Sequence, residues 1–234
     1  KKVDFYISNK RIDYTEAQLD RSIVSPEQIR LNLEEFKKSI YTDLFPERKV
    51  SWNYIPKTLI FAKDDHHATE IVNIVKEVFA ENFDDNIVPE KFVQKITYSA
   101  GDTDALIREF RTNKEFRIAV TVTLVSTGTD VKPLEVVFFM RDVNSDVLYT
   151  QMKGRGCRVI SDDKLREVTP NATTKDCFYI VDAIGVTEHD KQIPKAGNGK
   201  NGQKNKTPKL EQLLEYLSHG YVSDDNLALL RDYC

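Results

Sequence analysis

The chain has 234 residues, of which 40% are hydrophobic and 30% charged, and its formal net charge is −3, from 34 basic and 37 acidic residues. This is the composition of an ordinary soluble globular chain. No apolar run approaches the length of a membrane span, and no stretch is predicted to be a signal peptide. A small negative total does not exclude a nucleic-acid partner, because the relevant electrostatic field is local.

The cysteines indicate the cellular compartment, and the two chain ends bear on the extent of the protein. Cys157, Cys177 and Cys234 have no paired spacing, which predicts a reducing, cytoplasmic compartment and no disulfide framework. Cys157 is expected to be a small packing residue rather than a nucleophile. The chain begins at Lys1 without a methionine and ends just after a helical pattern. We therefore expect a piece of a longer protein.

Residues 1–56 are predicted to form a helical N-terminal extension and a connector. Ser25 followed by Pro26 is typical of a helix start. Four apolar residues then repeat at helical spacing: Ile29, Leu33, Phe36 and Ile40. This stripe predicts an amphipathic helix that packs on the core or on a domain interface and not on a membrane.

Residues 57–190 alternate short apolar runs with amphipathic patterns. The runs predict strands at 57–62, 95–99, 116–122, 134–139 and 177–182. Helices are expected to start at Asp64 or Asp65, at Asp102 or Thr103, and at Ser145. Nearly continuous apolar strands between helices predict an α/β fold, with a parallel sheet covered by helices on both faces and helical extensions at both ends.

Polar residues follow several of the predicted strands. Ligands of parallel sheets bind beyond the carboxyl ends of the strands. We therefore expect candidate site residues to gather at that edge: Lys63, Asp64, Gly101, Asp102 and the run 127–130, TGTD. His66, His67 and Glu70 also cluster at a helix start, where a solvated helix end is favoured over a metal site.

Residues 151–158, QMKGRGCR, place two arginines within four positions. If the stretch is helical, Gln151, Arg155 and Arg158 share one face. Gly154 and Gly156 are poor helix residues, and each lets another backbone or a ligand come close. A guanidinium pair suits phosphate oxygens better than a core. The bland alternative is a surface helix with ion pairs.

The C-terminal part differs in composition. Residues 191–209 hold six lysines, three glycines, three asparagines and no acidic residue, which predicts a flexible basic linker. Its lysines either solubilise a loop or contact a DNA backbone, and both interpretations stay open. Residues 210–234 are predicted to begin a helical region.

Taken in order, four segments resemble a known family. Residues 57–62 (KTLIFA), 122–131 (VTLVSTGTDV) and 151–158 resemble motifs IV, V and VI of superfamily-two helicases and translocases. Together with residues 178–189 (FYIVDAIGVTEH), the sequences of these segments are similar to those of the R subunit of type I restriction enzymes. That subunit carries the motor and the nuclease. The resemblance covers roughly residues 15–190.

The resemblance implies that residues 57–190 are the second RecA-like lobe of the motor, the helicase C-terminal lobe. ATP would bind between this lobe and a first lobe that carries the phosphate-binding loop and the metal-binding acid. Arg155 and Arg158 would reach the triphosphate as arginine fingers, and Gln151 would line the same cleft. Asp130 would couple to the nucleotide.

Gly128 is included among the nucleotide-binding residues and, with Thr127, resembles the part of motif V that touches the DNA backbone. The remaining DNA-facing residues implied are Lys63, Ser99 and Gly101.

The chain departs from the family pattern at two places. Thr123 stands where an acidic residue is common in motif V, and the GxxxxGK[ST] loop is absent. ATP and Mg²⁺ would therefore be held mainly by the absent first lobe. The fragment alone is expected to bind neither, to hydrolyse no ATP and to cut no DNA.

The implied function is ATP-driven translocation of double-stranded DNA before cleavage. The implied partners are double-stranded DNA, the first lobe and nuclease domain of the same polypeptide, and methylase and specificity subunits, with no membrane. Two alternatives stay open: the motor lobe of another DNA or RNA helicase, and a non-catalytic nucleic-acid or protein interaction module that retains the arginine pair.

Overall fold

The computed structural model describes residues 25–97, 101–122, 130–143, 146–184 and 186. The predicted linker 191–209 and the helical region 210–234 lie outside the described residues, as do Ser99, Thr127 and Gly128. No described helix is long and apolar enough to cross a membrane.

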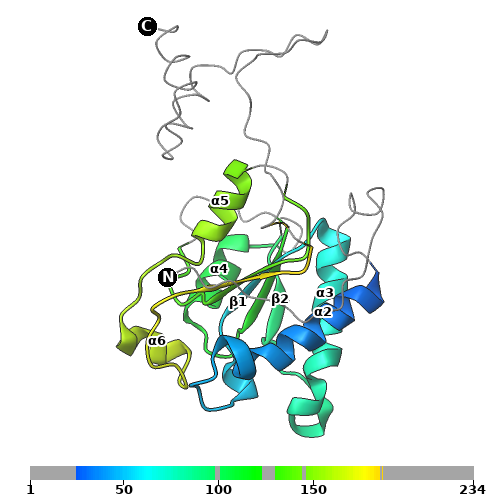
Figure 1. The fold of residues 1–234 in the computed structure, drawn as a ribbon. Helices are drawn as coiled ribbons and strands as arrows, with labels where there is room; N and C mark the ends of the chain where they lie inside the picture. The colour runs from blue at the N-terminus through cyan, green and yellow to red at the C-terminus, as the bar shows by residue number, and fades with distance from the viewer. Residues whose placement is uncertain (1–24, 98–100, 123–129, 144–145, 185, 187–234) are drawn as a thin grey trace, which may run out of the picture.

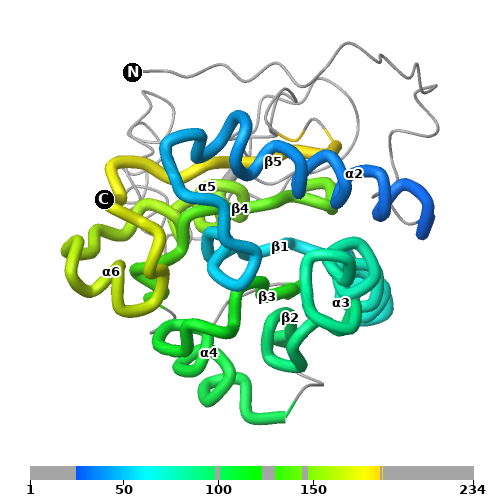
Figure 2. The backbone as a smooth tube through the Cα atoms, turned by 90° about the horizontal axis from the view of Figure 1, so that it is seen from below, coloured from blue at the N-terminus to red at the C-terminus, as the bar shows by residue number. Residues whose placement is uncertain are grey.

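The centre of the fold is a five-stranded sheet in the order β2-β3-β1-β4-β5, visible along its edge in Figure 2. The strands are β1 (Thr58–Phe61), β2 (Val93–Lys95), β3 (Ile118–Thr121), β4 (Val136–Phe139) and β5 (Tyr179–Asp182). Every pairing is parallel. The predicted parallel sheet is therefore confirmed (Figure 1).

Two apolar layers cover the sheet, because successive side chains of a strand point to opposite faces. Ile60 packs in one layer with α2 (Pro26–Ser39) and α3 (Asp65–Phe79). Its neighbour Phe61 packs in the other layer, with α4 (Thr103–Thr112) and α5 (Asp146–Gly154). Figure 2 shows α3 on one side of the sheet and α4 and α5 on the other. Helices thus cover both faces, as predicted.

Side-chain caps define where the helices begin. Ser25 accepts a hydrogen bond from the backbone N–H of Gln28 (3.3 Å) and begins α2. Asp64 caps α3 and Asp102 caps α4 in the same way. These bonds satisfy backbone N–H groups that have no partner within the helix. The capping residues are therefore Asp64 and not Asp65, and Asp102 and not Thr103. The predicted start of α5 at Ser145 lies outside the described residues.

The second strand lies earlier than predicted. We expected 95–99, but β2 ends at Lys95. The N–H of Ile96 still donates to the carbonyl of Val120 (2.8 Å), but the hydroxyl of Thr97 donates to the carboxylate of Asp65 (2.6 Å). Packing of Val93 against β3 sets the start, and the bond to α3 draws the chain out of the sheet.

The apolar stripe of α2 is core. Ile29, Leu33, Phe36 and Ile40 are all buried, and the ring of Phe36 lies 5.3 Å from that of Phe138 in β4. A π-helical turn η1 (Ile40–Leu44) and the 3-10 turn η2 (Trp52–Tyr54) lead from α2 to β1. Two further 3-10 turns, η3 (Ala80–Asn82) and η4 (Asp84–Asn86), follow α3. The boundary at residue 56 stays a prediction.

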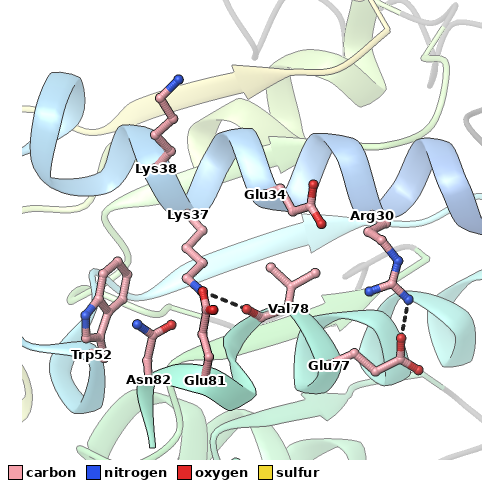
Figure 3. A pocket seen from close by; sticks show the side chains of 9 residues that line it. All are labelled: Arg30, Glu34, Lys37, Lys38, Trp52, Glu77, Val78, Glu81 and Asn82. Atoms are coloured by element: carbon pink, nitrogen blue, oxygen red, sulfur yellow. Dashed lines mark hydrogen bonds and ion pairs between the residues drawn. The ribbon is translucent and has the colours of Figure 1, made fainter.

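A groove of ≈ 520 Å³ separates the exposed sides of α2 and α3 (Figure 3). Lys37 on α2 donates to the carbonyl of Val78 (2.8 Å) and pairs with Glu81 (2.5 Å) on the α3 side. Arg30 pairs with Glu77 in the same way. These cations are already satisfied across the groove, so it is a polar seam that ties α2 to α3.

Three buried charged residues form a row at the amino edge of the sheet. Lys57, Arg117 and Glu135 each directly precede a strand, and the register of β1 with β3 and β4 places them side by side. Glu135 accepts a hydrogen bond from Arg48 (2.6 Å). Lys57 donates to the carbonyls of Asn113 (2.8 Å) and Phe116 (2.6 Å). These hydrogen bonds take the place of water for the three buried side chains, because buried charged groups need hydrogen-bond partners.

Lys57 should make the stability of the chain depend on pH. Burial, with the charge of Arg117 adding to it and Glu135 opposing it, lowers the pKa of Lys57 from 10.5 to about 6. Between these values the unfolded chain binds more protons than the folded one, so the free energy of unfolding rises with pH. For a single group the slope reaches at most about 1.4 kcal/mol per pH unit. Lys57→Met should flatten the rise in urea denaturations from pH 6.5 to 9.5.

The matched control for this experiment is Lys91→Met. Lys91 is exposed and pairs with Glu109, which raises its pKa, so its removal should leave the slope across this window unchanged. Lys175, whose pKa burial lowers to about 8, keeps a residual slope in both variants. Equal slopes for Lys57→Met and the unaltered chain would show that Lys57 is not the titrating group.

Candidate functional site

The arginine stretch is not the continuous helix that we expected. Helix α5 ends at Gly154. Three tighter bonds follow, from the N–H of Arg155 to Met152 (3.2 Å), of Gly156 to Lys153 (3.1 Å) and of Cys157 to Gly154 (3.4 Å). Each closes a turn of three residues instead of four. The condition under which Gln151, Arg155 and Arg158 would share one helical face is therefore not met. The arginines lie in a turn, here called the arginine turn (residues 155–158).

Gly156 gives the physical reason for this turn. An ideal Cβ on Gly156 would lie 2.1 Å from Cδ2 of Phe178, whereas one on Gly154 would have no neighbour within 4 Å. The close approach predicted for these glycines thus occurs at Gly156 only. Its partner is an aromatic side chain directly before β5, and neither a backbone nor a ligand.

The arginine turn lies where β4 and β5 begin. The ring of Tyr149 in α5 is 5.5 Å from that of Phe139, the last residue of β4, and Gly156 then meets Phe178 just before β5. Helix α5 therefore runs back along the sheet from its carboxyl edge to its amino edge. A helix of nine residues spans about 13 Å, the length of a four-residue strand.

Two guanidiniums and one carboxylate meet at the arginine turn. Nε of Arg158 lies 3.3 Å from Oδ1 of Asp130. Arg155 is half-buried, and its pKa is lowered first by burial and then by the charge of Arg158, with Asp130 opposing. The two guanidiniums lie beside this carboxylate at a place that is partly shielded from water. Such a place suits an anion with several oxygens. Gln151 is exposed in the last turn of α5.

The other predicted residues lie at the carboxyl edge. Lys63 follows β1 with an exposed side chain, and its backbone N–H donates to Nδ1 of His67 (3.1 Å). Gly101 is exposed with φ +91°, before the cap of α4. The prediction that Asp130 joins this group is wrong. The segment from residue 130 already leads into β4, and Asp130 pairs with Arg158 instead.

The histidines at the start of α3 have structural surroundings. His67 is buried, burial lowers its pKa, and its Nδ1 accepts the bond from Lys63. His66 is exposed, with Nδ1 3.8 Å from Glu70. Within the described part of the chain, no group of three or more His, Cys, Asp or Glu side chains is placed to hold a metal ion.

Two features of the site were missed from the sequence. Helix α6 (Asp162–Val168) follows the arginine turn, and Arg117 donates to the carbonyl of Val168 at its end (2.6 Å). Lys175 donates to the carbonyls of Lys132 (2.8 Å) and Arg158 (2.7 Å). Neither residue belongs to a motif, so only the fold reveals these contacts.

The sheet order and the two helical layers define the class of fold: the chain has a RecA-like α/β fold. It is 31% identical over 137 residues to the endonuclease subunit of the type I restriction enzyme EcoKI from Escherichia coli K12, which covers 56% of this chain and 10% of that protein. The chain is thus similar to the R subunit of type I restriction enzymes, and the predicted resemblance is confirmed.

A solved structure supports the fold. A fragment of a Vibrio vulnificus YJ016 protein described as an HsdR subunit of a type I restriction enzyme matches with a TM-score of 0.51 and 21% identity, over 77% of this chain and 32% of that one. No profile of a known protein family matches. The chain spans about a tenth of the curated relative and a third of the solved fragment.

Proposed function

We propose that the chain is the second motor lobe of a type I restriction enzyme R subunit and takes part in ATP-driven translocation of double-stranded DNA before cleavage. The observation that carries the proposal is the arginine turn, with Arg155 half-buried beside Arg158. The similarity to the EcoKI endonuclease subunit supports the assignment.

The chemistry of the turn fits a triphosphate. Phosphoryl transfer spreads negative charge over the oxygens of the γ-phosphate, and a guanidinium placed there can be worth about 10³–10⁵ in rate. Arg155 and Arg158 would supply this charge, with Gln151 beside them. Mg²⁺, when bound, would neutralise part of the negative charge on the phosphates. Its ligands, like the phosphate-binding loop, would come from the first lobe.

The carboxyl edge is the proposed DNA track. Lys63 and Gly101 lie there, exposed after β1 and before α4, and Ser99, Thr127 and Gly128 would belong to the same track. Nucleotide and DNA would thus contact different edges of one sheet. A lobe that closes on ATP at one edge moves its other edge along the DNA, which couples turnover to a step.

The proposed partners are the first motor lobe and the nuclease domain of the same polypeptide, double-stranded DNA, and methylase and specificity subunits. Because Arg155 and Arg158 belong to only one side of the proposed cleft, the chain alone should hydrolyse no ATP. The proposed location of the complex is the cytoplasm.

Arg158→Ala tests the proposal in the intact subunit. Arg158 is more than half exposed and already paired with Asp130, so we expect a loss of about ten- to a hundredfold in DNA-stimulated ATP hydrolysis, below the full effect of an arginine finger. The matched control is Arg166→Ala in α6, which removes an exposed arginine paired with Asp163 and should leave turnover unchanged.

DNA affinity separates this proposal from the alternatives. The affinity of the Arg158→Ala subunit for DNA, measured over a range of salt, should stay close to that of the unaltered subunit. If the substitution removes most DNA affinity and spares turnover, Arg158 is a DNA-backbone contact and the chain is an interaction module. Unchanged turnover with unchanged DNA affinity would leave the arginine turn without the proposed role.

A further inference from the structure

Lys175 joins two segments that are distant in the sequence. It lies between α6 and β5, and its ammonium donates to the backbone carbonyl of Lys132 at 2.8 Å and to that of Arg158 at 2.7 Å. Both are short, charge-assisted hydrogen bonds. The first carbonyl belongs to the segment that enters β4, and the second belongs to the arginine turn.

The two carbonyls flank the ion pair of the candidate site. Lys132 follows Asp130 by two residues, and Asp130 is the partner of Arg158 (Nε to Oδ1, 3.3 Å). Lys175 thus ties together the backbones of the two segments whose side chains form the pair. The side-chain contact is partly exposed to solvent, so by itself it would hold the turn weakly.

The turn needs such a tie because helix α5 no longer supports it. The tight backbone bonds end at Cys157, and Val159, two residues further on, is 83% exposed. Gly156 is fixed by Phe178, but Arg158 lies beyond that contact. The bond from Lys175 holds the backbone at Arg158 itself.

Placing a lysine here has an electrostatic cost. Burial lowers the pKa of Lys175 to about 8, against the opposing charges of Glu135 and Asp130. A Lys175 side chain that extended into water, with water bound to both carbonyls, would avoid that cost. The two hydrogen bonds of Lys175 are therefore kept at a cost in folding stability, which is typical of residues at functional sites.

We propose that Lys175 is a positioning residue: it holds the backbone of Arg158 at a set place relative to Asp130, so that the guanidinium is directed toward the triphosphate. This rests on the proposed function of Arg158. Lys175 touches neither nucleotide nor DNA in this scheme and acts only through the arginine turn.

Lys175→Met in the intact subunit tests the proposal. We expect kcat for DNA-stimulated ATP hydrolysis to fall about tenfold, the equivalent of one lost charged hydrogen bond, with KM for ATP little changed. Lys175→Arg, which keeps the charge and the donors, should restore most of the rate. The control is Lys164→Met, which removes an exposed lysine from α6 and should change neither constant.

A double-mutant cycle distinguishes positioning from a general structural role. If Lys175 acts through Arg158, Lys175→Met should have no further effect on kcat in the Arg158→Ala background. An equal loss in both backgrounds would overturn the proposal.

Hydrogen exchange provides a readout without activity. In the Lys175→Met subunit, amides of the arginine turn should exchange faster relative to amides of β2 and β3 than they do in the unaltered subunit. Unchanged exchange in the turn would overturn the role of Lys175 whatever the turnover shows. Normal turnover of Arg158→Ala combined with faster exchange in Lys175→Met would instead reject the proposed function and retain the tie.

Discussion

Arg155→Ala in the intact subunit should lower DNA-stimulated ATP turnover by about 10³-fold or more and leave ATP binding largely intact. Arg155 is half-buried and partly desolvated, so its charge acts through a medium less polarisable than water. Arg158 is more exposed, with 57% of its side chain accessible to solvent. The loss at Arg155 should therefore exceed that at Arg158.

Single-turnover hydrolysis and nucleotide binding, measured on the same preparation, separate the two effects. Arg155→Lys should recover only part of the rate, because an ammonium lacks the planar fork of donors that matches phosphate oxygens. Arg30→Ala is the matched control: Arg30 is an exposed arginine of α2 that pairs with Glu77 far from the turn. Normal turnover of Arg155→Ala would remove the assignment of the turn to the nucleotide.

Gly156→Ala should destabilise the lobe by about 1–3 kcal/mol, the usual cost of overpacking a filled site. A methyl group at this position would overlap the ring of Phe178, so either the ring or the turn must move. Gly154→Ala is a close control, because a Cβ there meets nothing within 4 Å and alanine is the better residue for the end of α5. Each variant adds one methyl group, at positions two residues apart, and urea denaturation of each compares them directly.

The same pair of variants reports on function. Displacement of the turn by Gly156→Ala should reduce DNA-stimulated turnover as well as stability, because Arg155 and Arg158 flank the glycine. Combining Gly156→Ala with Phe178→Leu makes room for the methyl group and should cost less than the sum of the two single changes. Equal stabilities of Gly154→Ala and Gly156→Ala would contradict the close packing at Phe178.

Local sequence patterns were sufficient for the elements of the sheet. The apolar runs before Lys63 and Arg141 correctly indicated strands, and Asp64 and Asp102 correctly indicated helix starts. These signals depend on neighbours within a few residues, so the chain itself carries them. The second strand was misplaced because the bond between Thr97 and Asp65 joins two different elements.

The candidate site was predicted by residue type but not by arrangement. The sequence of residues 151–158 was enough to indicate a pair of arginines that could bind phosphate. The end of α5, the pairing of Arg158 with Asp130 and the tie from Lys175 depend on residues that meet only in the folded chain. No spacing rule connects Lys175 to Arg158, because the distance between them along the chain has no structural period.

The sequence by itself thus determined the alternation of strands and helices, the caps and the chemical character of QMKGRGCR, since each of these depends on local backbone and side-chain preferences. Only the tertiary structure decided that α5 stops at Gly154 and that the arginine turn lies at the amino edge of the sheet, away from Lys63 and Gly101. The physical reason is the packing of Gly156 against Phe178. That contact forms between separate elements, so it adds a tertiary constraint to the poor helix propensity of the two glycines.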